Sequence, residues 1–332
     1  MNTNEKLMSI IFFSQTGIGV LGNAFLLCLF IFTYLSGHSL RLIDTILTQL
    51  TLANCLVLLL KGVPQIMATL GLKNFLDEIG CKIIFYLHRI SRGLSLTMTC
   101  FLTIFQAITI APSSFSLVQL KARAPKCIIP SSLFSWAFHL LLNVVIALKM
   151  KGPRHTENST EIQHFEYCSY VSLPRHQAIL FSIILSFPDA ACLGLMAFAS
   201  GYMVFLLYRH HKQVQQIHIS SISARTSPEI RATQTILLLV SIFLSIYLLS
   251  CIFLVYLHFK KTSLWLTQTS AFLTLSFPAV SPYLLISNDS QVPRYCYALW
   301  GRKRSHSSPA ADLHPLPMMT QQKLHTGERN KT

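Results

Sequence analysis

The stretch CKIIFYLHRISRGLSLTMTCFLTIFQAITIA, residues 81–111, decides the fold. It is a long apolar run, and an α-helix of about 20 apolar residues is enough to cross the ~30 Å hydrocarbon core of a bilayer. Its basic side chains, Lys82, His88, Arg89 and Arg92, all lie in its first half. The stretch therefore predicts a membrane-spanning helix with polar groups toward one end.

The rest of the chain has the composition of a membrane protein. Of its 332 residues 52% are hydrophobic and only 12% are charged, whereas about a quarter of an average soluble domain is charged. The lengths of the apolar runs, and the lack of alternating polar residues, exclude a transmembrane barrel. We therefore predict an all-α membrane protein, a bundle of seven transmembrane helices, with spans at 9–34, 44–70, 81–111, 128–149, 177–208, 232–258 and 264–287.

The distribution of Lys and Arg predicts the orientation. With the N-terminus outside, Arg41 and the basic groups after the third, fifth and seventh spans face the cytoplasm, while the outer loops also carry acidic residues. The positive-inside rule then gives a short extracellular N-terminus (1–8), a membrane domain (9–293) and a cytoplasmic tail (294–332) that is mostly disordered after 302. The formal charge of +15 reflects this topology and attraction to anionic inner-leaflet lipid, and does not indicate nucleic-acid binding.

Three N-glycosylation sequons give a second reading of the topology. NST at Asn158 lies between the fourth and fifth spans, whereas the sequons at Asn288 and Asn330 follow the seventh. Only one of these groups can face the glycosylating lumen. Asn158, in the longest outer loop, is the predicted glycosylation site.

Cysteine positions predict one disulfide and one candidate lipid anchor. Cys81, at the outer start of the third span, and Cys168, in the loop that carries Asn158, both face the oxidising compartment, so we expect them to pair. Cys296, in RYCYALWGRKR just after the last span, is a candidate for palmitoylation; the alternative is an unmodified amphipathic helix on the bilayer.

Five charged or ionisable side chains that lie where hydrocarbon is expected are the candidate site residues: Lys61 in the second span, His88, Arg89 and Arg92 in the third, and Asp189 in the fifth. A charged residue at a helix centre costs on the order of 3 kcal/mol, so such residues face a polar cavity or a partner. The spacing of three and four places the third-span residues along one helix face in the outer third of the membrane. We hypothesise that these five residues bind a ligand.

The charges also suggest what that ligand carries. Asp189 follows a proline, whose missing amide proton creates a polar niche, and we expect its carboxylate to offset one of the third-span cations. The remaining positive charge favours an anionic or strongly hydrogen-bond-accepting group. The alternative is that Arg89 snorkels to the interface and His88 only satisfies a neighbouring helix.

Other function classes find little support. The chain has no HExxH, GxSxG, GxxxxGK or CxxC motif, so we expect no enzyme, no metal and no cofactor. A retinal protein needs a lysine in its last helix, and 264–287 contains none. No internal repeat indicates a transporter.

Four segments resemble the vomeronasal type 1 receptors, a family of seven-helix, G-protein-coupled chemosensory receptors. They are YLHRISRGLS (86–95), RGLSLTMTCFLTIFQAITIAPSSFSLVQLKARAPKCI (92–128), SARTSPEIRATQTILLLVSIF (223–243) and FPAVSPYLLISNDSQV (277–292). The resemblance covers nearly the whole membrane domain. Phe105, Gln106 and Ala107 stand where rhodopsin-like receptors carry an acidic-Arg-aromatic triplet, and Asn54 stands where an acidic residue usually helps to hold sodium.

The resemblance implies rhodopsin-like receptor architecture in the plasma membrane and signalling through a heterotrimeric G protein of the inhibitory or a related class. It also implies small pheromone ligands, including sulfated steroids. Without an arginine at position 106, the resting state has to be held by packing and neutral hydrogen bonds. We expect the G-protein-facing residues to be Gln106, Lys121, Arg123, Lys126, Arg209, Lys212 and Arg231, each of which could also be only a topogenic charge.

Two alternatives remain at this point. A bitter-taste-type receptor is a related class with its own aberrant motifs, and the segment 92–128 argues against it. A seven-helix ligand-gated channel would conduct without a G protein and have its N-terminus inside the cell.

Overall fold

The computed structural model describes residues 3–37, 41–72, 75–112, 115–151, 162–165, 168–171, 175–217, 228–259 and 264–288. Seven helical segments in this part of the chain are long and apolar enough to cross a membrane. A helix satisfies all its backbone hydrogen bonds internally, which a spanning segment requires because lipid offers no partners. The predicted all-α bundle is confirmed.

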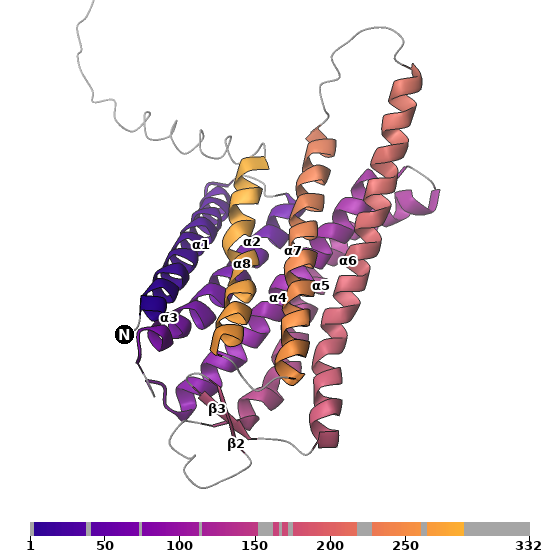
Figure 1. The fold of residues 1–332 in the computed structure, drawn as a ribbon. Coiled ribbons are helices and arrows are strands. Elements are labelled where there is room, and N and C mark those ends of the chain that lie inside the picture. Colours follow the sequence, from indigo (N-terminus) through magenta and orange to yellow (C-terminus); the bar gives the residue numbers. More distant parts are fainter. Residues whose placement is uncertain are drawn as a thin grey trace, which may run out of the picture.

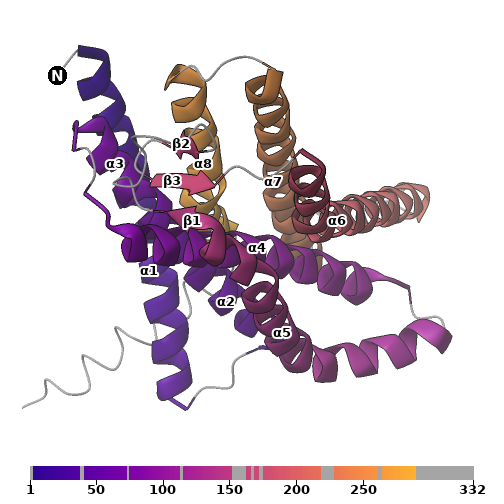
Figure 2. The same cartoon turned by 90° about the horizontal axis from the view of Figure 1, so that it is seen from below.

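The helices form one bundle, with α4 crossing it obliquely between the others (Figure 1, Figure 2). The second span is one continuous segment made of α2, the π-helical turn η1 and α3. The helical elements are α1 (Thr3–Leu35), α2 (Leu42–Val57), η1 (Leu58–Gly62), α3 (Val63–Thr69), α4 (Glu78–Ile110), α5 (Phe115–Lys149), α6 (Arg175–Ile217), α7 (Pro228–Phe259) and α8 (Leu264–Asn288).

Two helices extend furthest beyond their predicted spans. α5 begins at Phe115, well before the apolar run at 128, and α6 continues to Ile217, past 208. Backbone bonding does not depend on the bilayer, so polar residues such as Lys121 and Lys212 continue each helix into water. An apolar run therefore predicts the part of a helix that lies in the membrane, but it does not predict where the helix itself begins or ends.

The main core lies along α4, which packs against α2, α5, α6 and α7. Large apolar side chains such as Phe13, Leu141 and Phe198 point outward instead. In a soluble protein such a surface would be unfavourable, but here it faces lipid. The fully buried core side chains include Leu50, Leu94, Met98, Leu102, Met203 and Leu239.

A small three-stranded antiparallel sheet covers one end of the bundle, the end at which α1 begins (Figure 1). Its strands are β1 (Met150–Lys151), β2 (Ile162–Phe165) and β3 (Cys168–Val171), with β3 in the middle. The sequence analysis did not predict this sheet, because strands this short carry no readable alternation. A disulfide between Cys81 and Cys168, whose Cα atoms are 6.0 Å apart, joins β3 to the first turns of α4.

The π-helical turn in the second span is explained by Pro64, which follows it. Proline has no N–H and its ring clashes with the carbonyl four residues earlier, here that of Leu60. A wider turn at Leu58–Gly62 relieves this clash without ending the span. Lys61, one of the predicted ligand-binding residues, lies in this turn.

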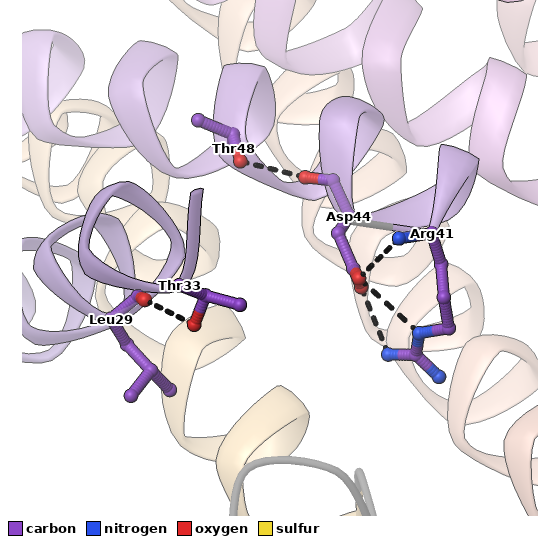
Figure 3. Close-up of polar contacts among 5 residues, drawn as sticks. All are labelled: Leu29, Thr33, Arg41, Asp44 and Thr48. Carbon is purple, nitrogen blue, oxygen red and sulfur yellow. Dashed lines mark hydrogen bonds and ion pairs between the residues drawn. The ribbon is translucent and has the colours of Figure 1, made fainter. Parts of the chain in front are cut away.

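At the opposite end, the start of α2 is fixed by a buried carboxylate (Figure 3). Asp44 is fully buried and accepts hydrogen bonds from the backbone N–H of Arg41 at 3.0 Å and from its guanidinium Nη2 at 2.9 Å. Thr48 donates to the Asp44 carbonyl, and Thr33 on α1 donates to that of Leu29. A negative group at a helix N-terminus also interacts favourably with the helix dipole, so α2 begins at a well-defined position.

Candidate functional site

A cavity of about 50 Å³ opens inside the bundle between α4, α7 and α8. One side is aromatic, with the rings of Phe243 and Phe277 packed edge to face and their centroids 4.4 Å apart. The other side carries hydroxyl groups and one guanidinium. Its lining residues are Val57, Arg92, Ser95, Leu96, Phe243, Ile246, Tyr247, Ser250, Leu273, Thr274, Phe277 and Pro278.

Arg92 supplies the charge of this cavity. Its guanidinium carbon lies 5.3 Å from the centroid of the Tyr247 ring, a cation–π contact between α4 and α7. In the part of the chain that the structure describes, no side chain or carbonyl accepts a hydrogen bond from this guanidinium. Its N–H groups are therefore available to a molecule in the cavity.

Tyr247 also contacts the only acidic residue among the predicted site residues. Its hydroxyl donates to Asp189 Oδ2 at 3.0 Å, so one side chain of α7 touches both Arg92 of α4 and Asp189 of α6. We expected Asp189 to offset a cation of the third span. Among the described residues it makes no ion pair within 4 Å with Arg89 or Arg92, and its hydrogen bond goes to the tyrosine.

A second, smaller cavity of about 10 Å³ lies between α4, α5 and α6 and is lined by Arg89, Arg92 and Asp189, together with His139 and Asn143. This is about the volume that holds one water molecule. The Nε atom of Arg89 is buried there without a hydrogen-bond partner. A water in this cavity would satisfy it.

The close approach of α4 and α5 beside this cavity depends on Gly93. A Cβ at this position would overlap the ring of His139, so only glycine fits. The ring is fixed by a 2.9 Å hydrogen bond between His139 Nε2 and the hydroxyl of Thr97. Arg89 and Arg92 are thus presented on a rigid helix face.

The structure brings three of the five predicted ligand-binding residues together. Arg89, Arg92 and Asp189 share the smaller cavity, and Arg92 also lines the larger one. Lys61 and His88 line neither of these two cavities, although they lie close enough to each other to interact electrostatically. The sequence could not predict which of the five residues line a cavity, because that depends on how the second span and α4 are rotated against each other.

Next to the larger cavity, the fully buried Asn54 joins three helices. Its Oδ1 accepts a hydrogen bond from Ser95 of α4 at 2.6 Å, and its Nδ2 donates to Ser281 of α8 at 3.0 Å. Both polar atoms of the amide are thus paired with hydroxyl groups. The position that commonly holds an acidic residue is here part of a neutral network.

Prolines in α8 leave carbonyls that need other partners. Pro282 cannot donate to the carbonyl of Pro278, and Asn23 of α1 does so instead, with its Nδ2 at 2.8 Å. Pro278 in turn cannot donate to the carbonyl of Thr274, a residue that lines the cavity. A threonine four residues before a proline is the signal in the sequence that could have identified Thr274.

At the end of the bundle opposite the sheet, Gln106 is buried between α4 and α7. It is only 4% exposed, and its Nε2 donates to Thr233 Oγ1 at 2.8 Å. We predicted that Gln106 faces a G protein, but in this conformation its side chain does not reach the surface. It instead makes a neutral contact of the kind expected to hold the resting state.

The predicted inner cations have different surroundings. Lys121 donates from Nζ to the carbonyl of Ala111 at 2.6 Å, which caps the C-terminus of α4. Lys212 lies over the ring of Tyr208, with its Nζ 5.1 Å from the ring centroid. Arg123, Lys126 and Arg209 are exposed, as is Lys212.

Some predicted residues lie outside what the structure describes. Arg231 is in α7, but its side chain is not among the described ones. Asn158 and Cys296 lie outside the described residues altogether.

Comparisons with known proteins agree with this arrangement of helices. Residues 6–298 match the model of the vomeronasal organ pheromone receptor family. The chain is 41% identical to vomeronasal type-1 receptor 1 of Homo sapiens over 295 residues, which cover 89% of this chain and 83% of that protein. It is 43% identical to human vomeronasal type-1 receptor 3 over 303 residues (91% and 97%), and 35% identical to vomeronasal type-1 receptor 90 of Rattus norvegicus over 292 residues (88% and 94%).

These matches confirm the resemblance seen in the sequence, and they do not support the bitter-taste-type or channel alternatives. The residues matched by the family model, 6–298, include both cavities, the Gln106–Thr233 contact and, apart from Glu5 at the start of the first, the seven membrane spans. The chain belongs to the vomeronasal organ pheromone receptor family and is a multi-pass chemosensory G-protein-coupled receptor, not an enzyme.

Proposed function

We propose that this receptor binds small, pheromone-like amphipathic molecules in the cavity between α4, α7 and α8. An anionic or strongly accepting group would contact Arg92, and an apolar body would pack against Phe243 and Phe277. The observation that carries the proposal is the Arg92 guanidinium, which lines an aromatic cavity without a hydrogen-bond acceptor among the described residues. Sulfated steroids, which the family resemblance implies, combine these two features.

The charge around the cavities supports an anionic ligand. Arg89 and Arg92 contribute two positive charges and Asp189 one negative charge, which leaves an excess of one. Placing a cation in an apolar region is unfavourable unless a partner compensates for it. A ligand with a single negative charge would supply that compensation.

Ligand binding would have to widen the cavity. Its volume of about 50 Å³ is well below the roughly 300 Å³ or more of typical small-molecule sites. The side chains Phe243, Tyr247 and Ser250 form the α7 side of the cavity, so widening displaces α7 relative to α4.

α7 also connects the two ends of the bundle. It carries Tyr247 at the cavity and Thr233 at the inner contact with Gln106. A ligand that moves α7 outward would weaken the Gln106–Thr233 hydrogen bond and open the inner face. By linkage, a G protein that binds the opened face would raise ligand affinity, with a coupling free energy of about 1–3 kcal/mol.

We further propose a heterotrimeric G protein of the inhibitory class as the partner. The exposed cations Arg123, Lys126, Arg209 and Lys212 would form its basic docking surface, and electrostatic complementarity of this kind mainly accelerates association. Pertussis toxin, which uncouples the inhibitory class, should abolish the response. A response that survives the toxin would assign a different class.

The plasma membrane, with the N-terminus outside, is the proposed location. The disulfide between Cys81 and Cys168 supports this orientation, because such bonds persist in oxidising compartments and this one lies at the end where α1 begins. Glycosylation at Asn158 and palmitoylation at Cys296 remain predictions. An N-terminal epitope tag should be stained in intact cells, and Asn158→Gln should migrate faster on a gel; a tag stained only after permeabilisation would reverse the topology.

The central test compares the wild-type receptor with Arg92→Ala in a G-protein activation assay against steroid sulfates and uncharged volatiles. We expect the wild type to respond to sulfates, and Arg92→Ala to lose potency by about 30-fold or more, since a charge-assisted hydrogen bond contributes about 2 kcal/mol or more. Lys82→Ala is the matched control, because Lys82 lies on the same helix but pairs with Glu78, and it lines neither cavity.

Surface expression of each variant is measured first. A sulfate response that Arg92→Ala retains would leave a receptor whose ligand does not use Arg92. A response to uncharged volatiles alone would overturn the anionic ligand.

A further inference from the structure

The hydroxyl groups that line the larger cavity have one property in common. Ser95, Tyr247, Ser250 and Thr274 each direct their hydroxyl proton to an acceptor in the protein. Ser250 Oγ donates to the Ile246 carbonyl at 2.8 Å, and Thr274 Oγ1 donates to the Ser270 carbonyl at 2.9 Å. A hydroxyl has one proton but two acceptor lone pairs, so these oxygens offer the cavity acceptors and no donors.

Thr274 adds a second acceptor to this wall. In a regular helix its carbonyl would accept the N–H of residue 278, but that residue is Pro278. The carbonyl oxygen of Thr274, a residue that lines the cavity, therefore lacks its usual helical donor. The α7 and α8 walls at Ser250 and Thr274 thus form a region rich in acceptors.

Donors to the cavity come from a different helix. Arg92 of α4 carries five N–H donors and no acceptor, and in the described part of the chain its guanidinium donates to no other group. The cavity is therefore polarised, with donors at Arg92 and acceptors at Ser250 and Thr274.

We propose that this polarity selects the ligand: an amphipathic monoanion whose other end carries an alcohol hydroxyl, and not a ketone, directed at Ser250 and Thr274. An alcohol supplies the proton that these oxygens lack. A ketone at the same place has lone pairs but no proton to donate, so its oxygen would face other acceptors. The hydroxyls of Ser250 and Thr274 can donate to it only if they break their hydrogen bonds to helix carbonyls. An ammonium group would also donate, but the net positive charge at Arg89 and Arg92 disfavours it.

This inference rests on the proposed anionic ligand and adds the chemistry of the opposite end. Two steroid monosulfates make a matched pair of probes: androstenediol sulfate ends in an alcohol, and dehydroepiandrosterone sulfate, with the sulfate on the same ring oxygen, ends in a ketone. Dose–response curves for G-protein activation are measured for both. We expect the alcohol to be about fivefold more potent, the factor that one net hydrogen bond supplies.

Two variants identify the groups responsible. Thr274→Val keeps the shape of the side chain and removes its hydroxyl, and Ser250→Ala removes the other one. Each should reduce the preference for the alcohol while the response to the ketone is retained, which also shows that the variant folds. Thr269→Val is the matched control, because Thr269 makes the same kind of bond to the Trp265 carbonyl in α8 but does not line the cavity.

The possible outcomes distinguish this inference from the proposed anionic ligand on which it rests. Equal potency of the two probes, or a preference for the ketone, overturns the inference and leaves the anionic ligand in place. A preference for the alcohol that survives in both variants, or is lost equally in the Thr269 control, overturns the assignment to Ser250 and Thr274. Silence toward both probes in a receptor present at the surface overturns the anionic ligand, and this inference with it.

Discussion

α7 and α8 form neighbouring walls of the same cavity but are attached to the bundle differently. α8 is joined to α1 and α2 along its length: Gln15 donates to the Phe272 carbonyl, Asn23 to that of Pro278, Asn54 to Ser281, and Tyr283 donates to the Ile18 carbonyl. α7 meets its neighbours at Tyr247, whose hydroxyl donates to Asp189 of α6, and at Thr233, whose hydroxyl accepts from Gln106 of α4.

The difference shows which helix can transmit a signal. Hydrogen bonds spread along a helix hold it to its neighbours, so α8 belongs with α1, α2 and α4 to a fixed frame. The bonds at Tyr247 and Thr233 contribute about 1 kcal/mol each, which is within the coupling free energy that a ligand supplies. We therefore expect α7 to move against this frame.

The largest effect should come from removing the hydrogen bonds that join α2, α4 and α8. Asn54→Ala removes a fully buried amide and leaves the hydroxyls of Ser95 and Ser281 without it. We expect the free energy of unfolding to fall by about 2–4 kcal/mol, because the variant loses two hydrogen bonds and creates a cavity. Thermal unfolding of the detergent-solubilised receptor measures this.

Asn143→Ala is the control for that variant. Asn143 is also buried, but its amide donates to the His139 carbonyl within its own helix. Asn143→Ala should therefore lower the free energy of unfolding by clearly less than Asn54→Ala does. If the two variants lose equal amounts of unfolding free energy, the hydrogen bonds between α2, α4 and α8 stabilise the receptor no more than a bond within one helix does.

A smaller effect should come from releasing α7 at its inner end. Gln106→Ala removes the donor to Thr233, so the resting arrangement loses about 1 kcal/mol of stabilisation relative to the active one, and we expect basal G-protein activity to rise about fivefold. Thr233→Val should act similarly. The double variant should add little to either single one, because both remove the same contact.

This prediction is checked in ligand-free cells with receptor density held equal. Unchanged basal activity in both single variants would show that the contact does not restrain α7. Fully additive effects in the double variant would show that the two side chains act through separate partners.

The smallest effect should come from the outer attachment. Tyr247→Phe keeps the ring beside Arg92 but removes the hydroxyl that holds Asp189. The released carboxylate would then compete with an anionic ligand for the cations, and we expect ligand potency to fall about two- to fourfold. Adding Asp189→Asn should restore much of that potency, since the competing charge is gone; a double variant that is weaker than Tyr247→Phe would contradict the explanation.

The sequence predicted what depends on local composition. The apolar runs gave the seven helices, and the compartment of Cys81 and Cys168 gave the pairing that the structure contains. The charges at Arg89, Arg92 and Asp189 were identified because they stand out against an apolar background.

The sequence could not predict how helices are rotated against one another. Tyr247 is unremarkable in its span, and its role follows only because its ring meets Arg92 and its hydroxyl meets Asp189. Gln106 was placed at the inner surface by position alone, whereas the rotation of α4 turns it toward Thr233. Lys61 and His88 lie apart from the two cavities for the same kind of reason.

The bond between Asn23 and Pro278 also bears on how the chain is made. These residues are 255 positions apart, and at about 5–20 residues per second a ribosome needs roughly 13–50 s to bring the second after the first. During that time the Asn23 amide is in the membrane with only the Gly19 carbonyl of its own helix to bind. The first span therefore gains this contact late in synthesis, and a chain truncated before α8 would display an asparagine that lacks its partner in α8, which membrane quality control could recognise.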